Sequence, residues 1–469
     1  MSDTSFASLQ LAAPFLANLD QLGYKQMTPV QAATLPLALQ GRDLIAQAKT
    51  GSGKTAAFGI GMLLRLNPAL FDVQGMVLCP TRELADQVAG ELRRLARGIG
   101  NVKIVTLTGG ISMRPQIASL EFGAHIVVGT PGRIRDHLQR KTLDLARLRT
   151  LVLDEADRMT DMGFYDEIAA IVRECPKHRQ TLLFSATYPD DIRQATEQFL
   201  ADPEEVAVET QHAPNQIDQS FVEIGFDGRE DAVARVLRHY EPQSAIAFCN
   251  TKARCRELAE ALRAQGFTAR ALYGEMEQRD RDETLVLFAN RSCTVLVATD
   301  VAARGIDVAG LELVINVDVS KDPEVHVHRV GRTGRAGETG LAVTLAAPNE
   351  KRFVRLIEEM QGIEADWCTL ADLDDGDGAA DPAPMMTLCI AGGKKDKLRP
   401  GDLLGALTGD AGLVKEQVGK INIFEFVSYV ALDRRVAQDA FDRLNNGNPL
   451  GVDFGTIKGR NFKMRFIET

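Results

Sequence analysis

Aromatic residues are scarce in this sequence: Phe, Trp and Tyr make up 6% of its 469 residues, with a single Trp. The hydrophobic cores must therefore be mainly aliphatic, which suits the strands of parallel α/β sheets. Long apolar runs are also missing, because charged residues interrupt each one before the roughly 20 residues that a bilayer span needs. The lack of long apolar runs leads us to expect no membrane-spanning helix.

A secretory start and a cysteine framework are missing as well. Asp3 precedes the first positive side chain, Lys25, so the basic region that opens a signal peptide is absent. The seven cysteines are an odd number without CxxC spacing, which favours reduced thiols. We expect a cytoplasmic protein that begins at residue 1, with no membrane partner and with a monomer as the default state.

The charge balance is negative overall but uneven along the chain. The sequence has 54 Lys and Arg against 64 Asp and Glu, a net charge of −10, which by itself argues against a nucleic-acid partner. Residues 383–469 carry 13 basic and 10 acidic residues, or +3, which leaves 41 minus 54, or −13, for residues 1–382. A terminal module of opposite sign hints weakly at polyanion binding.

Short β-branched runs alternate with helix-like stretches twice along the chain. This alternation is typical of βαβ units in a parallel sheet. The runs lie at 43–47, 75–80, 102–108, 125–130, 150–157 and 181–187, and then at 219–225, 244–250, 268–274, 294–300, 311–318 and 340–346. The sequence therefore predicts an α/β fold with two parallel-sheet domains in tandem.

Composition sets the predicted domain boundaries. The stretch before the second set of strands is polar and suits a linker. A later stretch has six Asp and no Lys or Arg, which is typical of a flexible tether that holds its neighbours apart. The end of the chain reads roughly βαββαβ, a split-βαβ pattern of small α+β domains. The predicted segments are a first domain at 1–205, a linker at 206–218, a second domain at 219–364, an acidic tether at 365–382 and an α+β domain at 383–469.

The run AKTGSGKT, residues 48–55, lies between a predicted strand and a predicted helix, as a phosphate-binding loop requires. Its glycines allow backbone N–H groups to close around a phosphate at the helix start. Lys54 would neutralise phosphate charge and Thr55 would offer its hydroxyl to Mg²⁺. A structural Gly-rich turn is the alternative. The ATP-binding residues predicted here are Ala48, Lys49, Thr50, Gly51, Ser52, Gly53, Lys54 and Thr55.

The run LVLDEAD, residues 151–157, is an apolar strand that ends in adjacent carboxylates. Asp154 and Glu155 should therefore lie at the carboxyl edge of the sheet, beside the phosphate loop. We expect Asp154 to hold Mg²⁺ and Glu155 to orient and deprotonate the attacking water. An acidic N-cap of the next helix is the alternative.

These motifs together resemble the DEAD-box family of ATP-dependent RNA helicases. The tetrapeptide Asp154-Glu155-Ala156-Asp157 follows AKTGSGKT and precedes Ser185-Ala186-Thr187, and ATDVAARGIDV and HRVGRTGRAG follow in the family's order. The resemblance covers about residues 6–350. It implies two RecA-like domains, ATP and Mg²⁺ as ligands, RNA as the partner, and local opening of short duplexes when the domains close. In the family, Ser185 and Thr187 couple the nucleotide state to unwinding; a strand-terminal cap is the alternative.

Phosphoryl transfer also needs guanidinium charge, which the second domain offers. Asp322 and Pro323 read as a helix start, which would place Arg329 and Arg332 on one helix face. Arg332 and Arg335 match the family's arginine fingers, with a solvated basic helix as the alternative. The resemblance also implies that Asp307 contacts the ribose.

Adenine recognition is expected at TPVQ, residues 28–31, which resembles the family's Q motif. Thr28 and Gln31 also suit a capping box with Pro29 at the first helical position. Both interpretations can hold, since a side chain fixed at a helix start is well placed to read a base. We expect Gln31 to contact adenine and Tyr24 to stack nearby.

RNA contacts in the two large domains are implied by further family motifs at strand ends. Small residues and backbone N–H groups there would bind phosphates without reading bases, and 2′-hydroxyl contacts would favour RNA over DNA. For any one of these positions an ordinary loop is the alternative. The predicted residues are Pro80, Thr81, Arg82, Gly109, Gly110, Thr130, Arg133, Asn250, Thr251, Arg279 and Thr299.

Target choice is expected in the tail, because the two large domains would have little sequence preference. Residues 398–413 and the strands after them resemble the C-terminal RNA-binding domain of the DbpA group of bacterial DEAD-box proteins. That group is recruited by a hairpin of 23S ribosomal RNA and acts on large-subunit precursor particles. The domain is RRM-like, yet the usual RNP1 pattern is missing and Tyr429 is the only aromatic residue at a suitable position.

Basic clusters are therefore the predicted RNA contacts of the tail. In NFKMRFIE, period-2 alternation should turn the apolar side chains inward and two basic side chains outward, with a solubilising face as the alternative. The residues chosen are Lys394, Lys395, Lys397, Lys463 and Arg465. Two other functions stay open: a general RNA helicase with a nonspecific tail, and an ATP-gated RNA clamp.

Overall fold

A computed structural model describes residues 4–48, 51–188, 193, 197–208, 217–303, 310–334, 339–374, 382–445 and 453–468. The chain divides into two compact units, Met1–His212 and Ala213–Thr469. Within the described part, no helix is long and apolar enough to cross a membrane.

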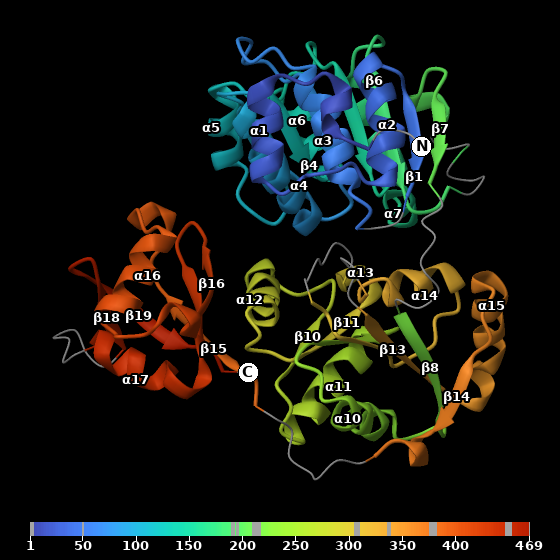
Figure 1. Cartoon of the computed structure of the whole chain (residues 1–469), viewed down its shortest axis with the longest axis vertical. Coiled ribbons are helices and arrows are strands. Elements are labelled where there is room, and N and C mark those ends of the chain that lie inside the picture. The colour runs from blue at the N-terminus through green and yellow to red at the C-terminus, as the bar shows by residue number, and fades with distance from the viewer. Residues whose placement is uncertain are drawn as a thin grey trace. The chain divides into compact units, whose positions relative to one another are not determined.

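The first unit is built on a sheet of seven parallel strands (Figure 1). In spatial order they are β3 (Ile104–Leu107), β4 (Ile126–Gly129), β2 (Gly75–Leu78), β5 (Thr150–Asp154), β6 (Gln180–Ser185), β1 (Leu44–Gln47) and β7 (Glu204–Ala207). All six predicted strands are present. The seventh, β7, pairs with β1 and was missed because its sequence EEVA is half acidic. The assigned linker, 206–218, therefore overlaps the end of a strand.

Helices connect these strands and cover the sheet. They are α1 (Ala13–Gln21), α2 (Pro29–Gln40), α3 (Lys54–Leu64), α4 (Arg82–Leu95), α5 (Arg114–Glu121), α6 (Pro131–Gln139), α7 (Ala156–Asp161) and α8 (Tyr165–Glu174). Each connection between strands of one parallel sheet must cross over, which places the helix starts at the carboxyl edge of the sheet. The loops that could bind ligands therefore gather at that edge.

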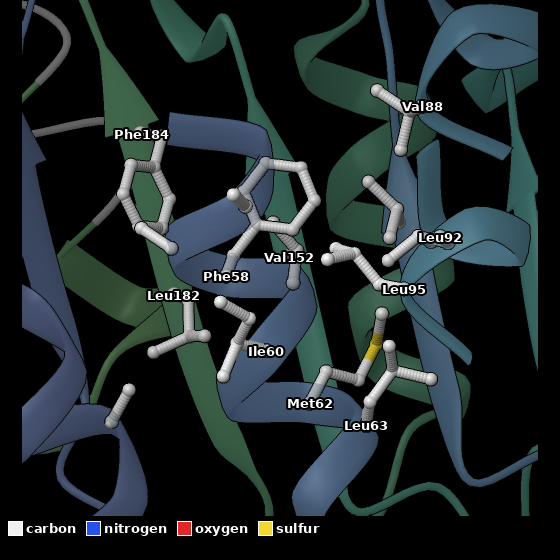
Figure 2. Close-up of a cluster of buried hydrophobic side chains, with 14 of the residues drawn as sticks. Phe58, Ile60, Met62, Leu63, Val88, Leu92, Leu95, Val152, Leu182 and Phe184 are labelled. Atoms are coloured by element: carbon white, nitrogen blue, oxygen red, sulfur yellow. The ribbon is translucent and has the colours of Figure 1, made fainter. Parts of the chain in front are cut away.

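Helix α3, which follows the phosphate loop, is buried nearly all round. Figure 2 shows its side chains Phe58, Ile60 and Met62 among residues of β5, β6 and α4. The rings of Phe58 and Phe184 lie 5.4 Å apart. Burial of this many apolar side chains, at roughly 1.5 to 3 kcal/mol each, fixes the helix against the sheet. The phosphate loop is therefore held by a rigid support.

The second unit repeats the first topology in another sheet of seven parallel strands. In spatial order they are β10 (Ala269–Leu272), β11 (Val295–Thr299), β9 (Ala245–Cys249), β12 (Leu313–Asn316), β13 (Gly340–Ala346), β8 (Ile217–Glu223) and β14 (Asp366–Thr369). The helices are α10 (Arg229–Tyr240), α11 (Lys252–Ala264), α12 (Gln278–Ala289), α13 (Asp300–Ala303), α14 (Pro323–Val330) and α15 (Lys351–Gln361). All six predicted strands are again present.

Strand β14 lies in the stretch assigned to the acidic tether, so the structure differs from that expectation. Its residues pair with β8, and the ring of Trp367 packs 5.7 Å from that of Phe221. Leu373 is buried in the core of the unit, and Arg235 Nε donates to its carbonyl at 2.9 Å. Apolar contacts and backbone pairing order these residues despite their acidic neighbours. Residues 375–381 lie outside the described part.

The end of the chain forms an antiparallel sheet, as the split-βαβ pattern predicts. Its order is β16 (Val418–Ile423), β17 (Ser428–Asp433), β15 (Met385–Ile390), β19 (Arg460–Phe466) and β18 (Phe454–Ile457). Helices α16 (Pro400–Gly409) and α17 (Arg434–Asn445) cover one face and share its core. Strand β18 was not predicted, because FGTI is short and follows a glycine-rich stretch.

The other face of this small sheet packs against α12 within the same unit. Cys389, Tyr429 and Ile467 form a cluster with Val286 and Leu287. Beside it, Thr387 Oγ1 lies 2.7 Å from Ser292 Oγ and accepts a hydrogen bond from Asn290 Nδ2 at 3.2 Å. The expectation that the tail is held apart from the second domain is therefore wrong in this structure, because apolar and polar groups match across this contact.

Candidate functional site

The phosphate loop presents a buried lysine that its surroundings leave unsatisfied. Gly51 and Gly53 have φ angles of 83° and 91°, a left-handed conformation that glycine adopts without strain. Lys54 follows at the start of α3 and is only 6% exposed. Its Nζ has no hydrogen-bond partner among the described residues. Since a buried ammonium is costly without a partner, this position suits an anion such as a phosphate.

Gln31 ties the predicted adenine-reading segment to the phosphate loop. Its Oε1 accepts from the N–H of Thr28 at 2.9 Å, which is one half of the expected capping box. Its Nε2 donates to the carbonyl of Gly53 at 3.1 Å. Thr28 Oγ1 has no partner within the described part of the chain, so the other half is not formed. The two predicted parts of the ATP site are thus in contact.

Tyr24 is fixed by a neighbouring helix. Its hydroxyl donates to Glu91 Oε1 at 2.6 Å, and the ring meets that of Phe6 edge to face at 6.2 Å. Burial, together with the Glu91 carboxylate, raises the pKa of Tyr24 well above its usual value. The tyrosine is therefore a neutral, oriented ring; its stacking role stays a prediction.

The carboxylates after β5 differ in their surroundings. Asp154 is fully buried, and this burial raises its pKa to about 7, against the attraction of nearby Lys54. Glu155 has a left-handed φ of 55° and is the N-cap residue directly before α7. Its Oε2 accepts from Arg158 Nη1 at 2.8 Å, and both side chains are buried. Sequence reasoning missed Arg158, although its spacing of three from Glu155 on a helix is a usable signal.

Asp157 links this element to the Ser-Ala-Thr segment. Its Oδ2 accepts from the backbone N–H groups of Ala186 and Thr187, both at 3.0 Å, and from Thr187 Oγ1 at 3.2 Å. In return, Ser185 Oγ accepts from the N–H of Asp157 at 3.2 Å. These hydrogen bonds outweigh burial and lower the pKa of Asp157, with nearby Lys54 and Arg158 assisting. Ser185 and Thr187 therefore form one hydrogen-bonded unit with the acidic segment.

The site suits Mg²⁺ carried by a phosphate better than a metal held by protein alone. The described residues contain no group of three or more His, Cys, Asp or Glu side chains that could hold a metal ion. Mg²⁺ in phosphate-transfer sites is usually bound by one or two carboxylates together with substrate phosphates. Asp154 provides a carboxylate near Lys54, and Thr55 is adjacent in sequence. The residues present therefore fit the predicted metal.

Predicted RNA contacts of the first unit come together at the carboxyl ends of β2, β3 and β4. Thr81 caps α4, its Oγ1 accepting from the N–H of Leu84 at 3.2 Å, and Thr130 precedes α6. Gly109 and Gly110 lie so close to Arg82 that a Cβ on Gly110 would overlap its guanidinium. Pro80, directly before Thr81, is buried.

Arg133 is held in the same region. Its Nη1 donates to Gln116 Oε1 at 3.0 Å and its Nη2 to the carbonyl of Ile111 at 3.1 Å. Gln116 also meets His137 Nε2 at 3.0 Å. Gln116 and His137, which sequence reasoning missed, are both buried and continue the hydrogen-bonded chain that begins at Arg133.

In the second unit, the predicted contact Asn250 binds a buried arginine, Arg329, that was not assigned a role. Arg329 donates to both carboxylate oxygens of Asp300, at 2.6 and 2.7 Å, and to Asn250 Oδ1 at 2.8 Å. It also donates to the carbonyl of Asp318 at 2.7 Å. Asn250 is thereby fixed, and Asp300 directly follows Thr299. Asn250, Asp300 and Asp318, which follow β9, β11 and β12, thus all find partners within the unit.

Three other assigned residues of this unit lie at different places. Thr251 caps α11, with Oγ1 accepting from the N–H of Arg254 at 3.3 Å. Arg279 is exposed on the first turn of α12. Asp322 caps α14 as expected, but the helix ends at Val330, so Arg332 lies beyond it rather than on the same helix face. Lys49, Thr50, Asp307 and Arg335 lie outside the described residues.

The tail residues show the alternation that the sequence predicts. Phe462 and Met464 are buried while Lys463 and Arg465 are exposed. Arg465 also lies 3.8 Å from Glu283 of α12, so part of this strand face meets the protein itself. Lys394, Lys395 and Lys397 are exposed in the loop after β15.

Three families match successive parts of the chain. They are the DEAD/DEAH box helicase family at residues 28–195, the helicase conserved C-terminal domain at 228–337 and the DbpA RNA binding domain at 387–465. Among curated proteins, the ATP-dependent RNA helicase DbpA of Escherichia coli is 50% identical over 99% of this chain and 100% of its own length. The DEAD-box ATP-dependent RNA helicase CshA of Bacillus cereus is 44% identical over 79% of this chain and 71% of its own.

Solved structures agree with these relationships. S. cerevisiae Dbp5 bound to RNA and ADP BeF3 is 30% identical, with a TM-score of 0.72 over 79% of this chain and 96% of that chain. A match over 79% of this chain agrees with the two tandem α/β domains that the sequence predicts.

Proposed function

This chain belongs to the DEAD-box family of ATP-dependent RNA helicases and carries a DbpA RNA-binding domain, and on that premise we propose its target and the roles of its residues. We propose that it opens short RNA duplexes locally within precursors of the large ribosomal subunit, in the cytoplasm, and that its tail brings it to a hairpin of 23S rRNA.

The unsatisfied Lys54 beside the buried Asp154 carries the assignment of roles at the ATP site. Lys54 neutralises phosphate charge at the start of α3, where the helix N-terminus favours an anion. Thr55 and Asp154 hold Mg²⁺, which when bound neutralises charge on the phosphates. Glu155, once released from Arg158, orients the attacking water and takes its proton. Arg332 and Arg335 contribute positive charge to phosphoryl transfer.

Adenine recognition follows from the contact of Gln31 with the phosphate loop. Because Gln31 Nε2 donates to Gly53 in this structure, its amide is already oriented at the edge of the site. Tyr24 and Asp307 complete the nucleoside contacts in this proposal. The hydrogen bonds of Asp157 to Thr187 then transmit the state of the site to the RNA-binding residues.

The RNA contacts of the two large units bind phosphates and sugars, so they give no target sequence. The tail supplies the target. This part rests on its resemblance to the DbpA group, whose members are recruited by 23S rRNA, and on the +3 charge of residues 383–469 against −13 for the remainder.

Strand displacement and ATP hydrolysis by the full chain test the proposal together. One short duplex is joined to a 23S rRNA fragment containing the peptidyl-transferase hairpin, and an identical duplex to a scrambled hairpin, at one stated salt concentration. We expect ATP-dependent displacement that is much faster on the 23S fragment. Equal rates would support a general helicase, and hydrolysis without displacement would support an RNA clamp.

A further inference from the structure

The turn between β16 and β17 exposes two aromatic rings in a chain that has few. Phe426 is 70% exposed and Phe424 is 36% exposed. The turn is tight, because the N–H of Phe424 donates to the carbonyl of Val427 at 2.8 Å. Phe424 also packs edge to face on Tyr429, with ring centres 5.7 Å apart. One ring therefore supports the turn while the other projects from it into solvent.

The loop after β15 braces this turn. The N–H groups of Lys394 and Lys395 donate to the carbonyls of Phe424 and Glu425 at 2.9 and 3.0 Å. The contact is so close that a Cβ on Gly393 would lie 2.5 Å from the Phe424 carbonyl oxygen. Backbone hydrogen bonds of this kind hold both segments in one position. We call residues 393–397 and 424–426 together the aromatic platform.

The charge around the aromatic platform is positive. Five basic residues, Lys394, Lys395, Lys397, Arg399 and Arg460, stand against two acids, Asp396 and Glu425, for a net charge of +3. Both acids are paired, Glu425 with Lys395 at 3.3 Å and Asp396 with Arg460 at 3.3 Å. In the part of the chain that the structure describes, Lys394 and Lys397 form no ion pair. Their charge is thus available to a polyanion.

The position where an RRM-like sheet would stack a base is not accessible in this unit. Tyr429, the aromatic residue of β17, is 4% exposed and packs with Cys389 against Val286 of α12. An aromatic ring that is to stack on a base must lie elsewhere on the tail. The aromatic platform is the place in the described tail where exposed rings and unpaired lysines adjoin.

We propose that Phe426 stacks on an unpaired base of the bound RNA while Lys394 and Lys397 contact neighbouring phosphates. This inference deepens the proposed function and rests on it, since it names the chemical group that the tail binds. Stacking on an aromatic ring beside basic side chains is a general way to hold single-stranded RNA. Glu425 weakens the attraction, because it faces the same ligand with a negative charge.

Binding of labelled RNA to the full chain tests the proposal. The probes are an RNA hairpin with an unpaired loop and a blunt duplex of the same stem. We expect Phe426→Ala to weaken hairpin binding about tenfold without changing duplex binding. Phe122→Ala, which removes a 79% exposed ring from the first unit, is the matched control and should leave both affinities unchanged. Hairpin affinity that is equal in Phe426→Ala and the natural chain would overturn the proposal.

The salt dependence of RNA affinity distinguishes the contribution of the lysine charges from that of base stacking. Replacing Lys394 and Lys397 together by Gln should lower the slope of log affinity against log salt by about 1 to 2, while Phe426→Ala should leave that slope unchanged. Glu425→Gln should tighten hairpin binding about twofold to threefold because it removes an opposing charge. A slope unaffected by the lysine substitutions would remove the phosphate contacts from the proposal.

The single Trp of the chain allows a direct optical test. In a chain carrying Trp367→Phe and Phe426→Trp, the only indole lies on the platform, and stacking on a loop base should quench its fluorescence as the hairpin binds. Binding without quenching would overturn base stacking. If the natural chain binds neither RNA, the proposed function itself fails, whereas strong binding that ignores Phe426 rejects the platform alone.

Discussion

The two large sheets share one strand order, but they differ in whether the buried basic side chain at the carboxyl edge is hydrogen-bonded. In the first unit, Lys54 Nζ is buried without a hydrogen-bond partner among the described residues, and burial raises the pKa of Asp154 to about 7. In the second, Arg329 is satisfied by Asp300, Asn250 and the Asp318 carbonyl. A sheet edge with buried charges that lack hydrogen-bond partners is suited to bind a ligand. A sheet edge whose charges are already hydrogen-bonded instead stabilises the fold.

Removing the positive charge of Lys54 should have the largest effect on activity. We predict that Lys54→Ala lowers RNA-stimulated ATP hydrolysis by about 10²- to 10³-fold or more, because phosphate charge is no longer neutralised. Phosphate release at saturating RNA measures this. Lys177→Ala, an exposed lysine of the same unit, is the control. Turnover retained in Lys54→Ala would contradict the assignment of the nucleotide site.

Breaking the paired edge should instead cost stability. Arg329→Ala removes a fully buried guanidinium and leaves the half-buried Asp300 carboxylate and Asn250 without their partner, which should destabilise the second unit by about 3 kcal/mol. Arg329→Lys should restore little, since an ammonium cannot replace the two-pronged contact with Asp300. Urea unfolding followed by circular dichroism measures both variants. Loss of activity without loss of stability would show that Arg329 acts on a ligand instead.

The pH dependence of stability should expose the cost of Asp154. Its folded pKa of about 7 lies above the usual value of 3.8, so the ionised carboxylate destabilises the folded chain above pH 7. This cost fades as pH falls from 7 toward 4. Asp154→Asn should therefore be more stable than the natural chain at pH 8, on the order of 2 to 4 kcal/mol, and equal to it near pH 4. Melting temperatures across pH test this, and a constant difference would contradict it.

The smallest effect should come from removing the hydrogen bond between the side chains of Thr187 and Asp157 in the first unit. Thr187→Val removes one hydrogen bond to Asp157 while both backbone bonds remain, and should cost about 1 kcal/mol or less of stability. We expect the amount of duplex opened per ATP to fall more than hydrolysis itself. Strand displacement and phosphate release from one reaction give this ratio. An unchanged ratio would remove Thr187 from coupling.

Much of this contrast could be predicted from the sequence. Six of the seven strands in each sheet, and the positions of Lys54, Asp154 and Asn250, follow from apolar runs that end in polar motifs. The strands β7 and β14 could not be predicted, because EEVA and DWCT read as polar, and only pairing with β1 and β8 makes them strands. Whether such an edge segment becomes a strand depends on pairing with its neighbour rather than on its own composition.

Side-chain partners across the fold were also beyond the sequence. Arg158 and Arg329 look like ordinary helix residues until the structure brings Glu155 and Asp300 to them. The packing of Tyr429 against α12 joins residues more than a hundred positions apart, which no local pattern signals. Local periodicity predicts which face of an element is buried, but not what covers it.

Hydrogen exchange of the full chain, with and without the magnesium complex of a non-hydrolysable ATP analogue, tests the contrast between the two edges most directly. We predict that amides of residues 51–57 and 185–187 exchange much more slowly once the analogue is present. Amides of α14 and of β12 should be slow already without it. Unchanged exchange at 51–57, or fast exchange in α14 before the analogue is added, would contradict the distinction between an open and a satisfied edge.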